Sequence, residues 1–198
     1  VGEAGKRLHT GRSRNEQVSL DLRLYLRRRI GLLKRGVEGV IAALWGQGSA
    51  AGDALMPAFT HFRPAQPVLV AHFFLAHVAP LRRDHDRLAA ARTEADAMPL
   101  GSGAVAGTSY PIDVQALACD LGFSRVVANS IDASSDRDFA ATFLYTCVVT
   151  MVHLSRLAEA LLILCGDEHR FFELSDALST GSSMMPQKKN PDPLELVR

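Results

Sequence analysis

The sequence predicts an all-α protein built as a bundle of long helices. Three observations support this class: apolar residues recur at helical spacing over long stretches, glycine- and proline-rich loops separate those stretches, and no strand pattern competes with them. The 198 residues are 47% hydrophobic, which is enough apolar material for one sizeable domain. We expect residues 1–198 to be a central helical domain truncated at both ends, because the sequence opens without methionine and stops within a starting helix.

The first long helix is expected from Arg14 to Trp45. Apolar side chains recur every three or four residues along one stripe: Val18, Leu22, Leu26, Ile30, Leu33, Val37, Val40 and Leu44. Ser13 and Glu16 have the spacing of a capping box, which satisfies free amides at a helix start. We expect a glycine cluster to end the helix after about 50 Å: Gly46, Gly48 and Gly52.

Two further long helices are expected later in the chain. One runs from Pro67 to Ala97, with Pro67 in its first turn and a kink at Pro80. A glycine-rich loop over 99–111 and a short helix over 113–121 follow. The last long helix, over 137–169, is apolar on nearly every face, so we expect other chains to cover it in a multi-helix core. Its polar content argues against a membrane span: His153, Arg156, Glu159 and several threonines.

Composition excludes several classes of function. A formal net charge of +1 gives no sign of a nucleic-acid or membrane partner. The three cysteines are widely spaced and form no CxxC pair, which argues against a disulfide framework and a zinc site and favours a reducing, cytoplasmic setting. The glycine-rich GSGAVAG at 101–107 resembles a dinucleotide loop but follows no predicted strand, so it predicts no nucleotide cofactor.

Two stretches place polar groups next to predicted helix starts. HTGRSRNEQ, at 9–17, sets Arg14 and Asn15 beside free amides, a natural site for a carboxylate, although an ordinary capped helix is an equal alternative. In THFRPAQP, at 60–67, the prolines hold the backbone extended and present Thr60 and His61. A single histidine before a helix is more often structural than catalytic.

A third stretch, STGSSMMPQKKNP at 179–191, is the hardest to explain structurally. It combines serines, glycine and a lysine pair on one loop, which we expect to end with Asn190 as N-cap and Pro191 as first helical residue. Lysines beside a helix N-terminus favour an anion. The alternative is a solvated basic turn, but we favour a functional loop.

In this order the three stretches resemble the signature regions of the fumarase/aspartase superfamily, with GSSMMPQKKNP at 181–191 as the most specific motif. The wording is most similar to the argininosuccinate lyase family, through LHTGRSRNEQ at 8–17, PLGSGAVAG at 99–107, SSDRDF at 134–139 and MPQKKNP at 185–191. The similarity extends over essentially all of the chain. Glu16 departs from the family, which usually has aspartate there.

The resemblance implies roles for individual residues. It implies four catalytic residues: Ser182, His61, Lys188 and Glu195. Ser182 would remove a proton from the succinyl moiety, and Lys188 would stabilise the resulting aci-carboxylate. His61, paired with Glu195, would protonate the departing guanidine directly or through water. It implies six substrate-binding residues: Arg14, Asn15, Thr60, Gln187, Asn190 and Arg137. No cofactor and no metal are implied.

The function implied is the reversible elimination of fumarate from argininosuccinate to give arginine, by a homotetramer whose active sites are shared between subunits. The piece alone is expected to be inactive, because missing regions of the family contribute substrate contacts. Two alternatives stay open: another fumarate-releasing lyase, such as adenylosuccinate lyase, or a crystallin-like structural relative without enzymatic function.

Overall fold

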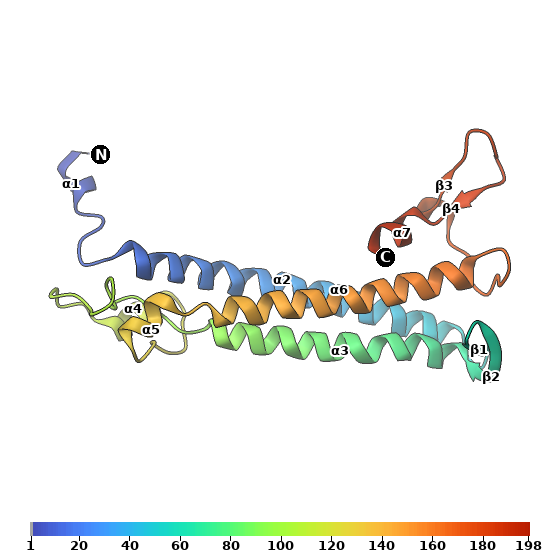
Figure 1. The fold of residues 1–198 in the computed structure, drawn as a ribbon, viewed down its shortest axis with the longest axis horizontal. Coiled ribbons are helices and arrows are strands. Elements are labelled where there is room, and N and C mark those ends of the chain that lie inside the picture. Colours follow the sequence, from blue (N-terminus) through green and yellow to red (C-terminus); the bar gives the residue numbers. More distant parts are fainter. Residues whose placement is uncertain (1) are drawn as a thin grey trace. The chain divides into compact units, whose positions relative to one another are not determined.

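The computed structural model describes residues 2–198 and is mainly helical (Figure 1). In chain order the helices are α1 (Gly2–Lys6), α2 (Arg14–Ala50), α3 (Val70–Ala95), α4 (Val114–Asp120), α5 (Ser130–Ser135), α6 (Asp138–Cys165) and α7 (Asp192–Val197), with a 3-10 turn at Asp176–Leu178. Two antiparallel hairpins complete the fold: β1 (Leu55–Thr60) with β2 (Arg63–Leu69), and β3 (Thr180–Gly181) with β4 (Lys189–Asn190). The predicted all-α, long-helix class is confirmed.

The chain divides into two compact units, each described here by itself. The first unit comprises residues 1–36 and 85–146, and the second comprises residues 37–84 and 147–198. The divisions fall inside α2, α3 and α6, so each long helix contributes one part to either unit.

The core of the first unit forms where α2 packs against the segments around α4. Leu20, Met98, Ala118 and Phe123 make one buried cluster. Met98 is fully buried, which stabilises the fold by roughly 1.5–3 kcal/mol for such a side chain, and its amide donates to the carbonyl of Arg125 at 2.8 Å. The packing of Met98 against Leu20, together with this hydrogen bond, holds the loop between α3 and α4 against α2.

The second unit is held by apolar side chains of α3 and by aromatic rings. Phe74, Val78 and Leu81 are buried along α3. Phe73 stacks on Phe172, with ring centroids 5.6 Å apart, so the segment after α6 packs on the start of α3. These contacts hold the β1–β2 end of this unit in place.

Several predicted helix ends are wrong. α2 continues through Gly46 and Gly48 to Ala50, since single glycines are tolerated inside a helix at a modest cost. The left-handed Gly52, with φ +55°, lies beyond the end. The last long helix stops at Cys165 rather than at residue 169.

The expectation of no strands is also wrong. Residues 55–69 form a hairpin, and Pro67, predicted to lie in a helix, pairs with Pro57 in it. The extended backbone predicted for THFRPAQP is confirmed from Arg63 onward, where proline and the residue before it favour extended conformations, whereas His61 and Phe62 form a turn with positive φ. Asn190 is likewise in β4, and the residue that caps α7 is Pro191, so the predicted asparagine cap is wrong.

α6 carries an apolar stripe that is not covered within the part of the chain described. Its exposed members recur at helical spacing: Leu144, Tyr145, Val148, Met151 and Val152. Among residues 2–198, α6 is also the one helix long and apolar enough to cross a membrane, by length and composition only. Such criteria are met equally by the central helix of a bundle, which makes this weak support for a membrane span.

Candidate active site

The first stretch lies at the start of α2, in the first unit. The amide of Ser13 donates to Glu16 Oε1 at 2.9 Å, and the amide of Asn15 donates to Ser13 Oγ at 3.3 Å, so the predicted capping box forms. Glu16 is 1% exposed, whereas Arg14 and Asn15 are exposed. The helix start is therefore rigid while the side chains expected to bind substrate face outward.

Glu16 also joins this helix start to the glycine-rich loop. Its Oε2 accepts from the amide of Gly103 at 2.8 Å, across 87 positions of sequence. Gly103 has φ +59°, and a Cβ there would lie 2.3 Å from the carbonyl oxygen of Gly107, so only glycine fits this turn. The GSGAVAG segment is thus a tight turn beside Arg14 and Asn15.

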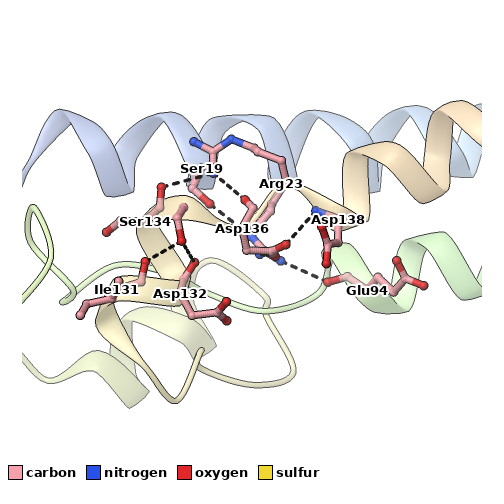
Figure 2. A network of polar contacts seen from close by, with 10 residues as sticks. Ser19, Arg23, Glu94, Ile131, Asp132, Ser134, Asp136 and Asp138 are labelled. Atoms are coloured by element: carbon pink, nitrogen blue, oxygen red, sulfur yellow. Dashed lines mark hydrogen bonds and ion pairs between the residues drawn. The ribbon is translucent and has the colours of Figure 1, made fainter.

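Arg137 lies just before α6. Figure 2 shows the network of polar contacts around its neighbour Asp136. The Arg137 guanidinium donates to the carbonyls of Asp136 and Ser134, at 2.5 and 3.4 Å. The Asp136 carboxylate accepts from Arg23 Nη2 at 2.5 Å and from the Asp138 amide at 2.7 Å. Arg137 is therefore held by its own backbone next to a fixed ion pair.

Arg23 is the buried centre of this network. Its side chain is 2% exposed, lies over the Phe139 ring at 4.0 Å, and donates to the carbonyl of Glu94 at 3.1 Å. Burial lowers the pKa of Arg23, and the neighbouring Asp136 carboxylate opposes that change. The pair ties α2, the end of α3 and the start of α6 together within the first unit.

In the second unit, the tip of the β1–β2 hairpin presents Thr60 and His61. Thr60 pairs with Arg63, which leaves His61 and Phe62 as a two-residue loop. Both have positive φ, 53° and 57°, as the favoured hairpin turn of type I′ requires at its central positions. Neither is glycine or asparagine, so this exposed turn holds His61 in a strained backbone conformation.

An apolar cavity of about 530 Å³ adjoins this hairpin. Its walls include His61, Phe62, Phe59 and, from the segment after α6, His169. The Phe59 ring meets His169 edge to face at 5.2 Å, which anchors β1 two residues before His61. The hairpin is therefore fixed at its base while its tip stays exposed.

The third stretch forms the loop between β3 and β4, also in the second unit. Ser182 is half-buried, and its hydroxyl accepts from the amide of Met185 at 3.2 Å. Thr180 pairs with Asn190 across the two strands, and its hydroxyl donates to Asp192 at 2.6 Å. Ser182 therefore lies at the start of a loop closed at its base by paired backbone and a side-chain hydrogen bond.

The two lysines of this loop differ in their surroundings. Lys189 Nζ lies 2.5 Å from Asp176 and 3.8 Å from Glu173, and the hydrogen bond lowers the pKa of Asp176 and raises that of Lys189. The Lys188 ammonium has no such partner within residues 2–198. Lys188 and Gln187 line a cavity of about 620 Å³, so Lys188 is the lysine available to an anion.

The predicted site residues fall into two groups. The first unit holds Arg14, Asn15 and Arg137, and the second holds Thr60, His61, Ser182, Gln187, Lys188, Asn190 and Glu195. In the described chain no hydrogen bond or ion pair joins His61 to Glu195, which is exposed on α7. Their pairing stays a prediction.

Comparison with known proteins shows to which family the chain belongs. A family model described as lyase matches residues 1–198. The chain belongs to this lyase family. Over 198 residues the chain is 52% identical to the argininosuccinate lyase of Roseiflexus castenholzii and 51% identical to that of Moorella thermoacetica. The matches cover 100% of the chain but 44% and 43% of those relatives, so it spans less than half of their length.

Solved structures extend the likeness to the fold. An EDDS lyase in complex with formate matches with a TM-score of 0.96 and 32% identity, over 100% of the present chain and 40% of the EDDS lyase chain. A fumarate lyase:delta crystallin from Brucella melitensis, bound to cobalt, matches with a TM-score of 0.89 and 25% identity, over 99% of the present chain and 45% of the crystallin chain. The chain therefore has the fold of the fumarate lyases, as the motifs predicted.

Sequence reasoning missed the residues that support these motifs. It assigned 101–107 no contact with the first motif stretch, although a buried Glu16 binds that loop. It assigned no partner to Arg23, although Asp136 lies in the SSDRDF motif. An arginine on the apolar side of an amphipathic helix, as Arg23 is, was the one available signal, because such a charge requires a partner.

Proposed function

We propose that the full-length lyase eliminates fumarate from argininosuccinate and releases arginine. The observation that carries the proposal is the 52% identity with an argininosuccinate lyase over all 198 residues, a range that contains the three motif stretches. The reaction would serve arginine biosynthesis, and the widely spaced cysteines agree with a cytoplasmic location.

In this proposal Ser182 removes the proton from Cβ of the succinyl moiety. The electron pair passes through the aci-carboxylate into the new double bond, the C–N bond breaks, and the guanidine leaves with a proton supplied from the side of His61, which Glu195 keeps charged. A serine acts as a base only where positive charge favours its alkoxide, and Lys188, whose ammonium is not neutralised by Asp176 as that of Lys189 is, supplies that charge.

Substrate binding would use the groups that the two units expose. Arg14 and Asn15 project from a capped helix start, and Thr60 lies beside the strained turn. Carboxylates of the substrate suit these donors, because charged hydrogen bonds to arginine and amides are strong. Four more residues complete the proposed site: Gln187, Asn190, Arg137 and Lys188.

We also propose a homotetramer with active sites shared between subunits. The apolar stripe on α6 supports it, because exposed apolar faces of this kind mark surfaces that another chain covers. The distribution of the site residues over two units supports it as well, because neither unit by itself holds all of the proposed site.

The direct test incubates the full-length protein with argininosuccinate and follows fumarate by its ultraviolet absorbance, with arginine measured separately. Adenylosuccinate serves as the comparison substrate. We expect equal amounts of fumarate and arginine from argininosuccinate, and a much lower rate with adenylosuccinate. Release of fumarate from adenylosuccinate alone, or from neither substrate, would contradict the proposal.

Ser182 and Ser183 are adjacent, so alanine variants of the two serines form a matched test of the proposed base. Ser182→Ala should lower kcat by roughly 10²- to 10⁴-fold, the usual loss with a general base, while Ser183→Ala should leave kcat nearly unchanged. Circular dichroism checks that both variants fold. Equal kcat values in the two variants would remove Ser182 from the mechanism.

A further inference from the structure

A second polar cavity lies in the second unit, between α3 and α6. Its volume is about 210 Å³, small for an organic cofactor but ample for an inorganic anion or a single carboxylate. His77 and Arg83 line it from α3, and His153 and Arg156 line it from α6. None of these four residues belongs to the proposed active site, so the cavity needs a separate account.

His153 is held in one orientation by a buried carboxylate. Its Nδ1 lies 2.6 Å from Oδ2 of Asp84, which is 0% exposed. An ionised carboxylate only accepts, so Nδ1 carries the proton, and Nε2 is the nitrogen left for the cavity. In the imidazolium form Nε2 also donates, and Asp84 then balances the ring's charge from the opposite side.

The two arginines lack counterions in the chain as described. Neither Arg83 nor Arg156 forms an ion pair or hydrogen bond within residues 2–198, whereas Arg23 and Arg27 each have a carboxylate partner. Glu159, one turn after Arg156 on α6, is paired with Arg198 at 3.4 Å. Burial and the charge of Arg156 lower the pKa of His77, as expected in a region of positive potential.

We propose that this cavity binds an oxyanion of the carboxylate or phosphate class, held by Arg83 and Arg156, with His153 as a third donor in its imidazolium form. Guanidinium groups bind carboxylate and phosphate through paired hydrogen bonds, and two unpaired guanidiniums beside an oriented imidazole form a site of that kind. The oxyanion has two possible sources: a free anion from solution, or a carboxylate side chain contributed by another copy of the protein.

The test uses the full-length protein and inorganic phosphate as the probe. Melting temperatures are measured in sodium phosphate and in sodium chloride of equal ionic strength, for wild type, Arg83→Gln and Arg156→Gln. Arg82→Gln is the matched control, because Arg82 neighbours Arg83 on α3 but does not line the cavity. Arg156→Lys keeps the charge and serves if the glutamine variants do not fold.

For a free anion, we expect phosphate to raise the wild-type Tm by a few degrees in a concentration-dependent way. Arg82→Gln should keep this rise, Arg83→Gln and Arg156→Gln should lose it, and Arg156→Lys should weaken it. If the oxyanion is a side-chain carboxylate of another copy, phosphate should leave the wild-type Tm unchanged. Arg83→Gln and Arg156→Gln should then melt at a lower temperature than Arg82→Gln or fail to fold, and Arg156→Lys should restore much of the lost stability. The proposal is overturned if phosphate acts alike on all variants, or if phosphate has no effect and the lining variants melt like Arg82→Gln.

Discussion

At the scale of single residues, the chain accepts a local cost at the tip of its first hairpin. His61 and Phe62 adopt the left-handed backbone region, which costs roughly 1–2 kcal/mol for each residue with a side chain. The paired strands on either side, with Thr60 opposite Arg63, impose this conformation. Strain of this kind gathers at functional sites, which agrees with the proposed role of His61.

Phe62 offers a test of the strain through two substitutions that both remove the ring. Phe62→Gly should be more stable than Phe62→Val by about 1–2 kcal/mol, because glycine adopts a positive φ freely and a β-branched residue does not. Urea denaturation of the full-length variants measures the difference. Equal stability of the two would show that the turn is unstrained.

Glu16 is a second residue whose contribution depends on both of its oxygens. Glu16→Gln replaces one acceptor by an amide group that faces a backbone N–H of Ser13 or Gly103, so we expect a loss of about 1–3 kcal/mol. The control is Asp21→Asn, an exposed carboxylate on the same helix, which should change stability by less than about 0.5 kcal/mol. Matching urea midpoints for the two variants would argue against the clamp on the glycine-rich loop.

At the scale of elements, the first unit depends on an ion pair rather than on apolar packing alone. Arg23 of α2 reaches Asp136 before α6 and the carbonyl of Glu94 in α3, so one side chain joins three helical segments. A buried pair of this kind adds little net stability over apolar packing, but the loss of one partner leaves an uncompensated charge. The pair therefore fixes the arrangement that carries Arg137.

Removal of the carboxylate should show this dependence. Asp136→Asn should destabilise the full-length protein by about 3–5 kcal/mol, because the Arg23 guanidinium stays buried without its counterion. Asp138→Asn, two residues along and exposed, should cost about 0.3–1 kcal/mol through the helix dipole. Thermal melting distinguishes the two, and a similar small loss in both would mean that Arg23 finds another partner.

At the scale of the whole molecule, the proposed shared site predicts complementation between inactive variants. Full-length Asn15→Ala and Ser182→Ala proteins are dissociated, mixed and reassembled, and fumarate release is compared with that of each variant treated alone. Mixed oligomers should recover part of the wild-type activity, because some sites then receive both intact motifs. Oligomers shown to be mixed but still inactive would exclude sites shared in this way.

The sequence by itself determined the features that depend on neighbours a few residues apart. Helical periodicity predicted α2, α3 and α6, the capping box at Ser13 and Glu16 depends on a spacing of three, and the three motif stretches identified the family. Its error at Pro67 has a different origin, because strand pairing overrode local preferences there.

Tertiary structure alone decided the partners of the polar side chains. Arg23 and Asp136 are 113 positions apart, Glu16 and Gly103 are 87 apart, and Asp84 and His153 are 69 apart. It likewise selected Lys189 rather than Lys188 for neutralisation by Asp176. The three distant pairs follow from burial, since a charge removed from water is stable only where the fold brings a partner to it. No local sequence pattern predicts which of these distant side chains pair.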